Sequence, residues 1–441
     1  MSRGARTKTD WGPYGRGPIG LLALVALIDA VDRQILPGVL PLIQDDLGFS
    51  DTQAGFLGSI FVIMSFVATI PAGYMADRLR RTRVIAVVLG SWAAISALNA
   101  GVRNYWQFLA VRAALGVGET IDNPSSASLV ADYYAPGIRG RAYAYQRIAP
   151  IFGMAVGLAV AGIVGDLLGW RVAFLVVGVP GSLLAISIWR MKEPRRGESD
   201  AREGGELLEV ASRRGWRSLW PEIKIAASVP SLRALMIGGA ISGGATAGFG
   251  FWAAAFYNRH TSLEVAGSAS LVGAIILVGA LIGTFVGGRA ADRARGRDPG
   301  APMRLAGTSQ SIAALIFAVT FLPVPTWVRL PGHIAGVAFL LAAFPALTAM
   351  TSEVVPAQIR GISFSVAGFL AALASAGSPV LIGGIADRFP ILVDGRMRGN
   401  LALAFLVVTP LIFLGALVVL NGRRHVANDI ANVDAVAAKL G

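Results

Sequence analysis

Long apolar stretches alternate with short polar segments along the whole chain. Each apolar stretch is about 20 residues long or longer, which is the length that a helix needs to cross the hydrocarbon core of a membrane. We therefore expect an all-α integral membrane protein. The pattern predicts twelve transmembrane helices, over residues 17–40, 52–76, 84–101, 105–132, 142–166, 170–190, 231–257, 264–290, 303–323, 327–352, 360–386 and 398–420.

A polar stretch rich in Arg and Glu separates the sixth predicted helix from the seventh. This stretch marks a division of the chain into two halves of six helices each. The predicted parts are an N-terminal half over residues 1–190, a cytoplasmic linker over 191–230, a C-terminal half over 231–420 and a cytoplasmic tail over 421–441.

Three short motifs occur once in each half, in the same order and about half a chain length apart. The pairs are GYMADRLRRTR (73–83) with GGRAADRARGR (287–297), PGIRGRAYA (136–144) with PAQIRGIS (356–363), and GIVGD (162–166) with GGIADR (383–388). Two six-helix halves related by an axis along the membrane normal describe the major facilitator architecture. The repeat therefore predicts this fold with two pseudo-symmetric halves, and a substrate site near the midplane between them.

The composition supports a membrane protein, because only 15% of the residues are charged and the mean hydropathy is +0.62. The net charge of +13 comes from basic residues that cluster at the ends of the predicted helices, as at 78–83, 139–141 and 293–297. Such clusters orient membrane proteins with the basic side inward, so we expect both termini in the cytoplasm and no nucleic-acid partner. Cysteine is absent and the three histidines are scattered, so we expect no metal site and no cofactor.

The first predicted helix carries charges that are rare at this depth, namely Asp29, Asp32 and Arg33. Ionisable groups inside a membrane usually face a cavity or a partner and mark a transport pathway. The spacings i,i+3 and i,i+4 predict that the three side chains lie together on one helical face. A structural Asp–Arg pair that holds this helix to a neighbour is the alternative.

The fourth predicted helix carries a second charged pair, Arg112 and Glu119, two turns apart and therefore on one face. Asp122 follows one turn later and could equally be a helix-end group. The matching helices of the second half carry no charge in mid-span, but they do carry Phe249, Phe251, Trp252, Phe339 and Phe344, for which packing is at least as good an interpretation. A cavity with one charged and one apolar wall would suit an amphiphilic substrate.

The sequence GYMADRLRRTR resembles the loop motif of the major facilitator superfamily. The resemblance implies a cytoplasmic latch formed by Gly73, Asp77, Arg78 and Arg81. Asp292 and Arg293 are the matching residues of the second half. The alternative is that the arginines only orient the protein in the membrane.

The first half as a whole resembles the bacterial spinster branch of this superfamily. The resemblance rests on DRQIL (32–36), SDTQAG (50–55) and RAALGVGE followed by Asn-Pro and ADYYAP (112–136). It implies a transporter of lysophospholipid- or sphingolipid-like substrates in the bacterial inner membrane, with Asp32, Arg33, Arg112 and Glu119 at the substrate and proton site. Asp29 has no counterpart in the family pattern, so its role does not transfer.

We therefore expect a monomeric secondary transporter that works by alternating access, is coupled to protons and contacts membrane lipids. With no histidine in mid-span, the proton carrier should be a carboxylate, Asp32 or Glu119.

A proton-coupled organic-anion or drug transporter of the same superfamily is the alternative. A lipid-modifying enzyme is disfavoured because no catalytic constellation is found, and the absence of a G-x-x-x-x-G-K-[ST] loop disfavours ATP-driven transport. A sensor that transports nothing is a third class, and measured substrate flux would exclude it.

Overall fold

The structure of the protein is a computed structural model that describes residues 11, 13–119, 122–195, 198–199, 216–295, 298–356, 359–393 and 395–438. It consists almost entirely of helices. The long helices of the first half are α1 (Gly17–Leu47), α2 (Asp51–Arg78), α3 (Arg81–Leu98), α4 (Tyr105–Glu119), α5 (Asp122–Tyr133), α6 (Pro136–Leu168) and α7 (Trp170–Trp189). Those of the second half are α10 (Pro230–His260), α11 (Val265–Arg295), α12 (Ala301–Thr320), α13 (Thr326–Glu353), α14 (Arg360–Arg388) and α15 (Leu401–Gly422).

These helices confirm the predicted fold class, with α4 and α5 together in the place of the fourth predicted helix. Nine described helices are long and apolar enough to cross a membrane. Several helices extend beyond the predicted ends, since α1 continues to residue 47 and α6 begins at residue 136. These extensions carry polar or basic residues, which a helix can hold outside the hydrocarbon layer but which end an apolar pattern in the sequence.

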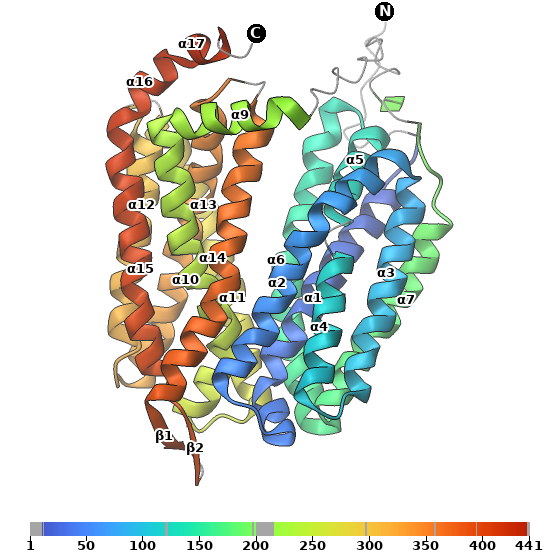
Figure 1. Ribbon diagram of the computed structural model, residues 1–441, viewed down its shortest axis with the longest axis vertical. Coiled ribbons are helices and arrows are strands. Elements are labelled where there is room, and N and C mark those ends of the chain that lie inside the picture. Colours follow the sequence, from blue (N-terminus) through green and yellow to red (C-terminus); the bar gives the residue numbers. More distant parts are fainter. Residues whose placement is uncertain are drawn as a thin grey trace, which may run out of the picture.

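The helices form two bundles, which we call the N-half (α1–α7) and the C-half (α10–α15), and Figure 1 shows them side by side. Within the N-half, α1 packs along α6 and α3 along α7; within the C-half, α10 packs along α15 and α11 along α13. The halves meet mainly along two helix pairs, α2 with α14 and α6 with α11. We call these contacts the α2–α14 seam and the α6–α11 seam.

Each seam contains a close helix crossing that only glycine permits. A Cβ atom at Gly55 would lie 2.5 Å from the Pro379 carbonyl oxygen in the α2–α14 seam. A Cβ atom at Gly273 would lie 2.6 Å from the Ala155 carbonyl oxygen in the α6–α11 seam. Because both distances are shorter than van der Waals contact, the absence of side chains is what lets the two halves meet.

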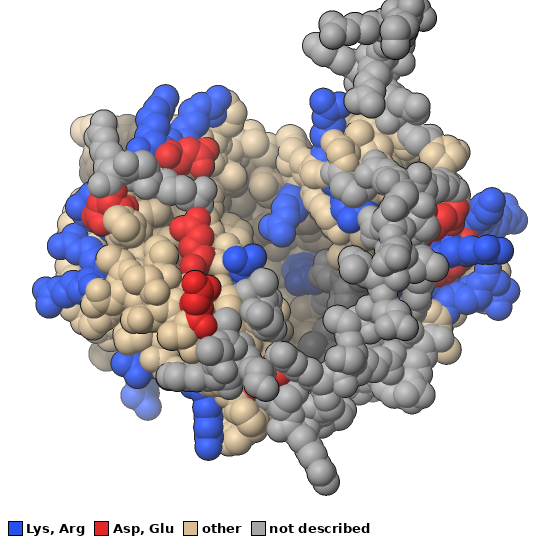
Figure 2. Space-filling view, turned by 90° about the horizontal axis from the view of Figure 1, so that it is seen from above, with Lys and Arg blue, Asp and Glu red and all other residues tan. Residues whose placement is uncertain are grey.

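The two ends of the bundle differ. The start of α1 and the end of α15 lie at one end, the top of Figure 1, which we call the termini end. Viewed from there, the molecule has a hollow between the two halves, with basic side chains around it (Figure 2). The seam contacts at Gly55 and Gly273 lie toward the other end, which we call the opposite end.

Short elements cover both ends. At the termini end, the helix α9 (Trp216–Ser228) crosses the C-half and contacts α10 and α14, and the helices α16 (Val426–Ala431) and α17 (Val433–Ala438) follow α15 (Figure 1). At the opposite end, the strands β1 (Pro390–Val393) and β2 (Arg396–Gly399) form an antiparallel hairpin with Leu392 opposite Met397. The sequence carries a hairpin signal there, Asp394-Gly395, which the prediction of helices alone did not use.

Candidate functional site

Two of the predicted charges on α1 form an ion pair with each other. The Arg33 guanidinium donates to the Asp29 carboxylate at 3.1 Å, one helical turn away. The Arg33 side chain is 42% exposed and that of Asp29 23%, so the pair is accessible to solvent within the bundle. An exposed pair of this kind contributes little to stability, which leaves it free to exchange partners.

Asp32 has a different environment from its neighbour Arg33. It is buried at 2% exposure and accepts a hydrogen bond of 2.5 Å from the Ser96 hydroxyl of α3. Asp29, Asp32 and Arg33 are therefore neighbours on α1, as predicted from their spacing, but Asp32 is buried whereas the other two are partly exposed. Successive helix positions differ by about 100°, so Arg33 lies nearly in line with Asp29 while Asp32 is rotated into the N-half.

Arg112 of α4 is also buried, at 3% exposure, and its charge acts on the Asp32 carboxylate. Burying a charge without an opposite charge nearby is costly, so the two groups stabilise each other inside the N-half. Asp32 and Arg112 are thus both buried within the N-half, and their joint role at a substrate and proton site stays a prediction. Glu119, the other predicted residue of this pair, ends α4, and its side chain lies outside the described residues, as does that of Asp122.

Phe61 of α2 connects the exposed and the buried charges. Its ring centre lies 6.0 Å from the Arg33 guanidinium carbon and 5.0 Å from that of Arg112. Both distances allow a cation–π interaction, which strengthens when the groups are shielded from water. Phe61 could not be singled out from the sequence, because a phenylalanine in an apolar helix carries no signal of its own.

The aromatic residues predicted for the C-half wall separate into two groups. Phe249 packs against Phe317, Phe321 and Phe405, and Trp252 is fully buried and donates to the Pro379 carbonyl, so both have packing roles. Phe251 meets the N-half, because a Cβ atom at Gly58 would lie 2.7 Å from its ring.

A second aromatic contact between the halves involves Phe66 of α2 and Phe369 of α14, with ring centres 4.7 Å apart. The predicted residues Phe339 and Phe344 are 37% and 61% exposed on α13. Phe251 and Phe369 thus bring aromatic rings of the C-half to the junction, in contrast to the charges of α1 and α4.

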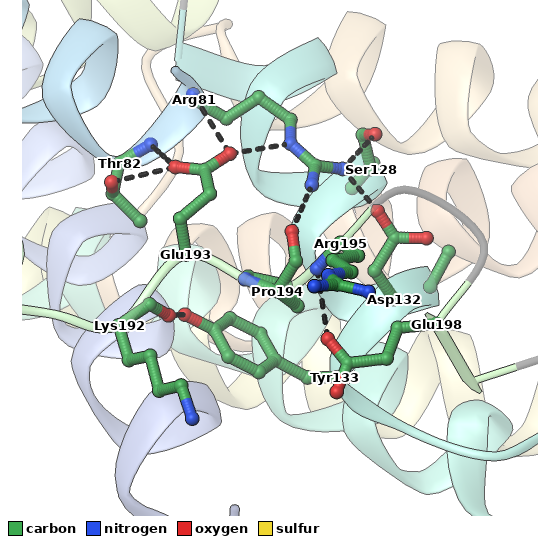
Figure 3. A network of polar contacts seen from close by, with 12 residues as sticks. Arg81, Thr82, Ser128, Asp132, Tyr133, Lys192, Glu193, Pro194, Arg195 and Glu198 are labelled. Carbon is green, nitrogen blue, oxygen red and sulfur yellow. Dashed lines mark hydrogen bonds and ion pairs between the residues drawn. The ribbon is translucent and has the colours of Figure 1, made fainter. Parts of the chain in front are cut away.

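At the termini end, Arg81 of the predicted latch lies in a buried network within the N-half (Figure 3). Its guanidinium forms ion pairs with Asp132 of α5 and with Glu193, which follows α7, and it donates to the Ser128 hydroxyl at 2.8 Å. The Thr82 amide and hydroxyl also donate to Glu193, at 2.9 and 2.7 Å. One arginine thus joins the start of α3, the end of α5 and the segment after α7.

Glu193 is ionised more readily than a free glutamate. Burial by itself would raise the pKa of its carboxyl, but hydrogen bonds from Thr82 and Arg81 outweigh burial, and the pKa lies below its ordinary value of 4.5. The Glu193 carboxylate is therefore charged at neutral pH.

Of the remaining predicted latch residues, the structure describes the side chains of Asp292 and Arg293. The surroundings of Gly73 and the side chains of Asp77 and Arg78, near the end of α2, lie outside what the structure describes. Asp292 and Arg293 are exposed near the end of α11, and neither forms an ion pair with another residue in the described part of the chain.

At the opposite end, a buried ion pair that was not predicted from the sequence joins the two halves. Arg259 of α10 donates to both carboxylate oxygens of Asp51 of α2, each at 2.6 Å, and both side chains are 3% exposed or less. Arg259 also donates to the Gln44 side chain and to the Gly399 carbonyl, at 3.0 Å each. The only sequence signal was an arginine at the end of an apolar helix, which does not identify its partner.

A histidine is also buried in the C-half, within a helix. His333 of α13 is 5% exposed, and its Nδ1 lies 2.7 Å from the Tyr257 hydroxyl of α10. It lies in the third turn of α13, among the rings of Phe256, Phe317 and Phe321. Within the described residues, no three His, Cys, Asp or Glu side chains cluster as a metal site would require.

Comparison with known proteins identifies the superfamily to which the chain belongs. Residues 22–379 match the Major Facilitator Superfamily. The chain is 32% identical over 171 residues to the probable L-galactonate transporter of Escherichia coli, which covers 39% of this chain and 38% of that protein. It is 26% identical over 286 residues to the sphingosine-1-phosphate transporter SPNS2 of Danio rerio, which covers 61% of this chain and 55% of that protein. These matches span less than two thirds of the length of either relative.

A solved structure shares the fold across the whole chain. A bacterial homologue of the human lysosomal transporter spinster, in an inward-facing and unoccupied conformation, superimposes with a TM-score of 0.84. The two chains are 20% identical, and the match covers 95% of this chain and 98% of the other. The two chains therefore share one fold, which agrees with the resemblance to spinster transporters noted in the sequence.

Proposed function

The chain belongs to the Major Facilitator Superfamily of membrane transporters, and we propose that it carries an amphiphilic, lipid-like substrate by proton-coupled alternating access. The substrate class is that of lysophospholipids or sphingolipids. The sphingosine-1-phosphate transporter among its relatives supports this class. A transporter does not change its substrate chemically, so this protein is not an enzyme.

One observation carries the proposal, namely the contrast between the two sides of the junction. The N-half supplies two guanidinium groups, Arg33 and Arg112, both near the Phe61 ring. Guanidinium groups bind phosphate and carboxylate well, because they present several N–H donors in one plane. The C-half supplies the aromatic residues Phe251 and Phe369 at the junction. An anionic head group would bind the first set and an apolar tail the second.

Asp32 is the proposed proton carrier, and Glu119 is the second candidate for this role. Asp32 is bonded to α3 through Ser96 and lies beside Arg112 of α4, so its surroundings depend on how these helices are placed. A rearrangement that moves Arg112 or Ser96 relative to Asp32 changes the relative energies of its charged and neutral forms. Proton binding and conformation would thereby be linked.

The proposed orientation places the termini end in the cytoplasm of a bacterial inner membrane. The hollow of Figure 2 would then open inward, with the opposite end closed toward the outside. In this arrangement the residues of GYMADRLRRTR, with Asp292 and Arg293, form the cytoplasmic latch when the hollow closes. We propose that one chain, surrounded by membrane lipids, is the working unit.

Flux into proteoliposomes tests the function. We expect uptake or release of a fluorescent lysophospholipid to respond to an imposed pH gradient, and the Asp32→Asn variant to lose that response at least ten-fold. Asp298→Asn is the matched control, because Asp298 forms an exposed ion pair at the termini end. A response to the pH gradient that persists in Asp32→Asn would contradict the proton role, and the absence of lysolipid flux in the unmodified protein would contradict the substrate class.

An organic anion is the second candidate substrate, because the probable L-galactonate transporter is a relative of this chain. The two arginines could bind a sugar acid through its carboxylate, but such a substrate would leave the aromatic residues of the C-half without a role. The same proteoliposomes distinguish the two candidates when radiolabelled galactonate replaces the lysophospholipid. Flux of galactonate alone would favour this second candidate.

A further inference from the structure

The third motif of the internal repeat has no part in the site described above. It places a glycine and an aspartate one helical turn apart near the end of α6, as Gly162 and Asp166. It places the same two residues near the end of α14, as Gly383 and Asp387. Residues four apart share one face of a helix, so each glycine and its aspartate can contact the same neighbouring element.

In the α6–α11 seam, both residues contact the start of α11 in the other half. A Cβ atom at Gly162 would lie 2.8 Å from the Ala269 side chain, so the helices meet closely at this glycine. One turn further, the Asp166 carboxylate accepts a hydrogen bond of 2.6 Å from the Ala266 amide. Ala266 is the second residue of α11, where the helix has amides with no partner of its own.

In the α2–α14 seam, the matching residues make the same contacts with the start of α2. A Cβ atom at Gly383 would lie 2.2 Å from the Asp51 carbonyl oxygen. The Asp387 carboxylate accepts from the Asp51 amide at 3.0 Å, and from the Thr52 amide and hydroxyl at 2.8 and 2.6 Å. Asp51 and Thr52 are the first two residues of α2.

Both contacts cap a helix from outside its own half. A carboxylate near a helix start is favoured because it satisfies free amides and interacts with the positive end of the helix dipole. Each cap also depends on the close approach that its glycine allows. Both caps therefore exist only while the two halves touch at the opposite end, and both must break when that end opens.

We propose that Gly162–Asp166 and Gly383–Asp387 are a matched pair of locks that hold the opposite end closed during transport. The four residues are positioning residues, since they set the balance between the two states without meeting the substrate. The α2–α14 lock is the stronger, because Asp387 accepts three hydrogen bonds from α2 and Asp166 accepts one from α11. The inference rests on the proposed alternating access.

Distances between two spin labels at the opposite end test the locks. The chain has no cysteine, so Trp106→Cys and Trp327→Cys introduce two labelling sites without background. Trp106 near the start of α4 and Trp327 near the start of α13 are 72% and 77% exposed, and one lies in each half. We expect the labelled protein in nanodiscs to show a short and a long distance, one for each state.

Replacing each aspartate by alanine should increase the ratio of long to short distances about five-fold, as expected for the loss of one helix cap. Asp387→Ala should have the larger effect, and the double variant the largest. Gly162→Ala and Gly383→Ala should act in the same direction without removing any charge. The matched controls are Asp298→Asn, and Gly140→Ala and Gly377→Ala, where an added Cβ meets nothing within 4 Å.

Two results would overturn the inference, and they differ. An unchanged ratio in Asp166→Ala, Asp387→Ala and both glycine variants, with two distances still present, would show that these residues are not locks while alternating access holds. A single distance in the unmodified protein at every pH and substrate concentration would overturn alternating access, and the locks with it. Folding of each variant is checked by the retention of a single distance between labels placed within one half.

Discussion

At the residue scale, Asp32 shows how one helix position decides the environment of a charge. Arg33, next to it, is exposed and paired with Asp29, whereas Asp32 is buried and bonded to Ser96. The sequence identified all three as functional candidates, because charges in an apolar helix are conspicuous. It could not assign their partners, since Ser96 and Phe61 belong to other helices and are ordinary residues there.

The Ser96–Asp32 bond should contribute measurably to stability. Ser96→Ala removes a donor to a buried carboxylate, so we expect the free energy of unfolding to fall by about 1.5–3 kcal/mol. Ser187→Ala is the control, because the Ser187 hydroxyl donates an exposed hydrogen bond to the Leu183 carbonyl of its own helix. Unfolding in mixed detergent micelles measures both. Equal stabilities of the two variants would show that the bond to Asp32 adds nothing.

Glu193 should make the termini end sensitive to acid. Because its pKa is lowered in the folded protein, its contribution to stability is fully present above the ordinary value of 4.5 and is lost as the pH falls through the lowered value. The Glu193→Gln variant lacks this contribution. We expect it to be about 1–3 kcal/mol less stable than the unmodified protein at pH 7, with the difference shrinking toward pH 3.

Thermal unfolding in detergent across this pH range measures the effect. Glu264→Gln serves as the control, because Glu264 is exposed at the start of α11. A difference between Glu193→Gln and the unmodified protein that stays constant with pH would contradict the role of ionised Glu193.

At the element scale, the apolar helices were predictable and their polar partners were not. A stretch of about 20 apolar residues is a strong signal for a spanning helix, so the prediction found every one of these helices. The hairpin of β1 and β2 was missed, although Asp394-Gly395 indicates one. Contacts between distant helices, such as Arg259 with Asp51, depend on how the halves pack, which no local pattern determines.

The Arg259–Asp51 pair should stabilise the closed opposite end strongly. Arg259→Gln leaves the Asp51 carboxylate buried without its counter-charge, which in comparable pairs costs about 3–5 kcal/mol. We expect the two labels at positions 106 and 327 to move almost entirely to the long distance. In the double variant Arg259→Gln/Asp51→Asn, part of the population should return to the short distance, because the uncompensated charge is then removed.

The exposed pair of Asp46 and Arg171 is the matched control, since it lies at the same end but within the N-half. Its removal should change stability by less than about 1 kcal/mol and leave the label distances unchanged. If Arg259→Gln behaved like this control, the buried pair would not be part of the closure.

At the scale of the whole molecule, the internal repeat explains more than the fold. Three repeated motifs predicted two related halves, and one of them supplies matched contacts in both seams. The sequence showed the repeat but not its use, because Asp166 and Asp387 bind backbone amides. Any helix start offers such amides, so no particular residue type at the partner position signals the contact.

The orientation of the whole molecule in the membrane gives the last prediction. Basic residues gather toward the termini end, so this end should face the cytoplasm. A single cysteine at Leu392, which is 70% exposed in the hairpin, should react in intact cells with a maleimide that cannot cross the inner membrane. A single cysteine at Arg424, exposed beyond α15, should react only after the inner membrane is permeabilised. Because the natural chain has no cysteine, labelling comes from these positions alone, and the reverse pattern would turn the hollow of Figure 2 outward.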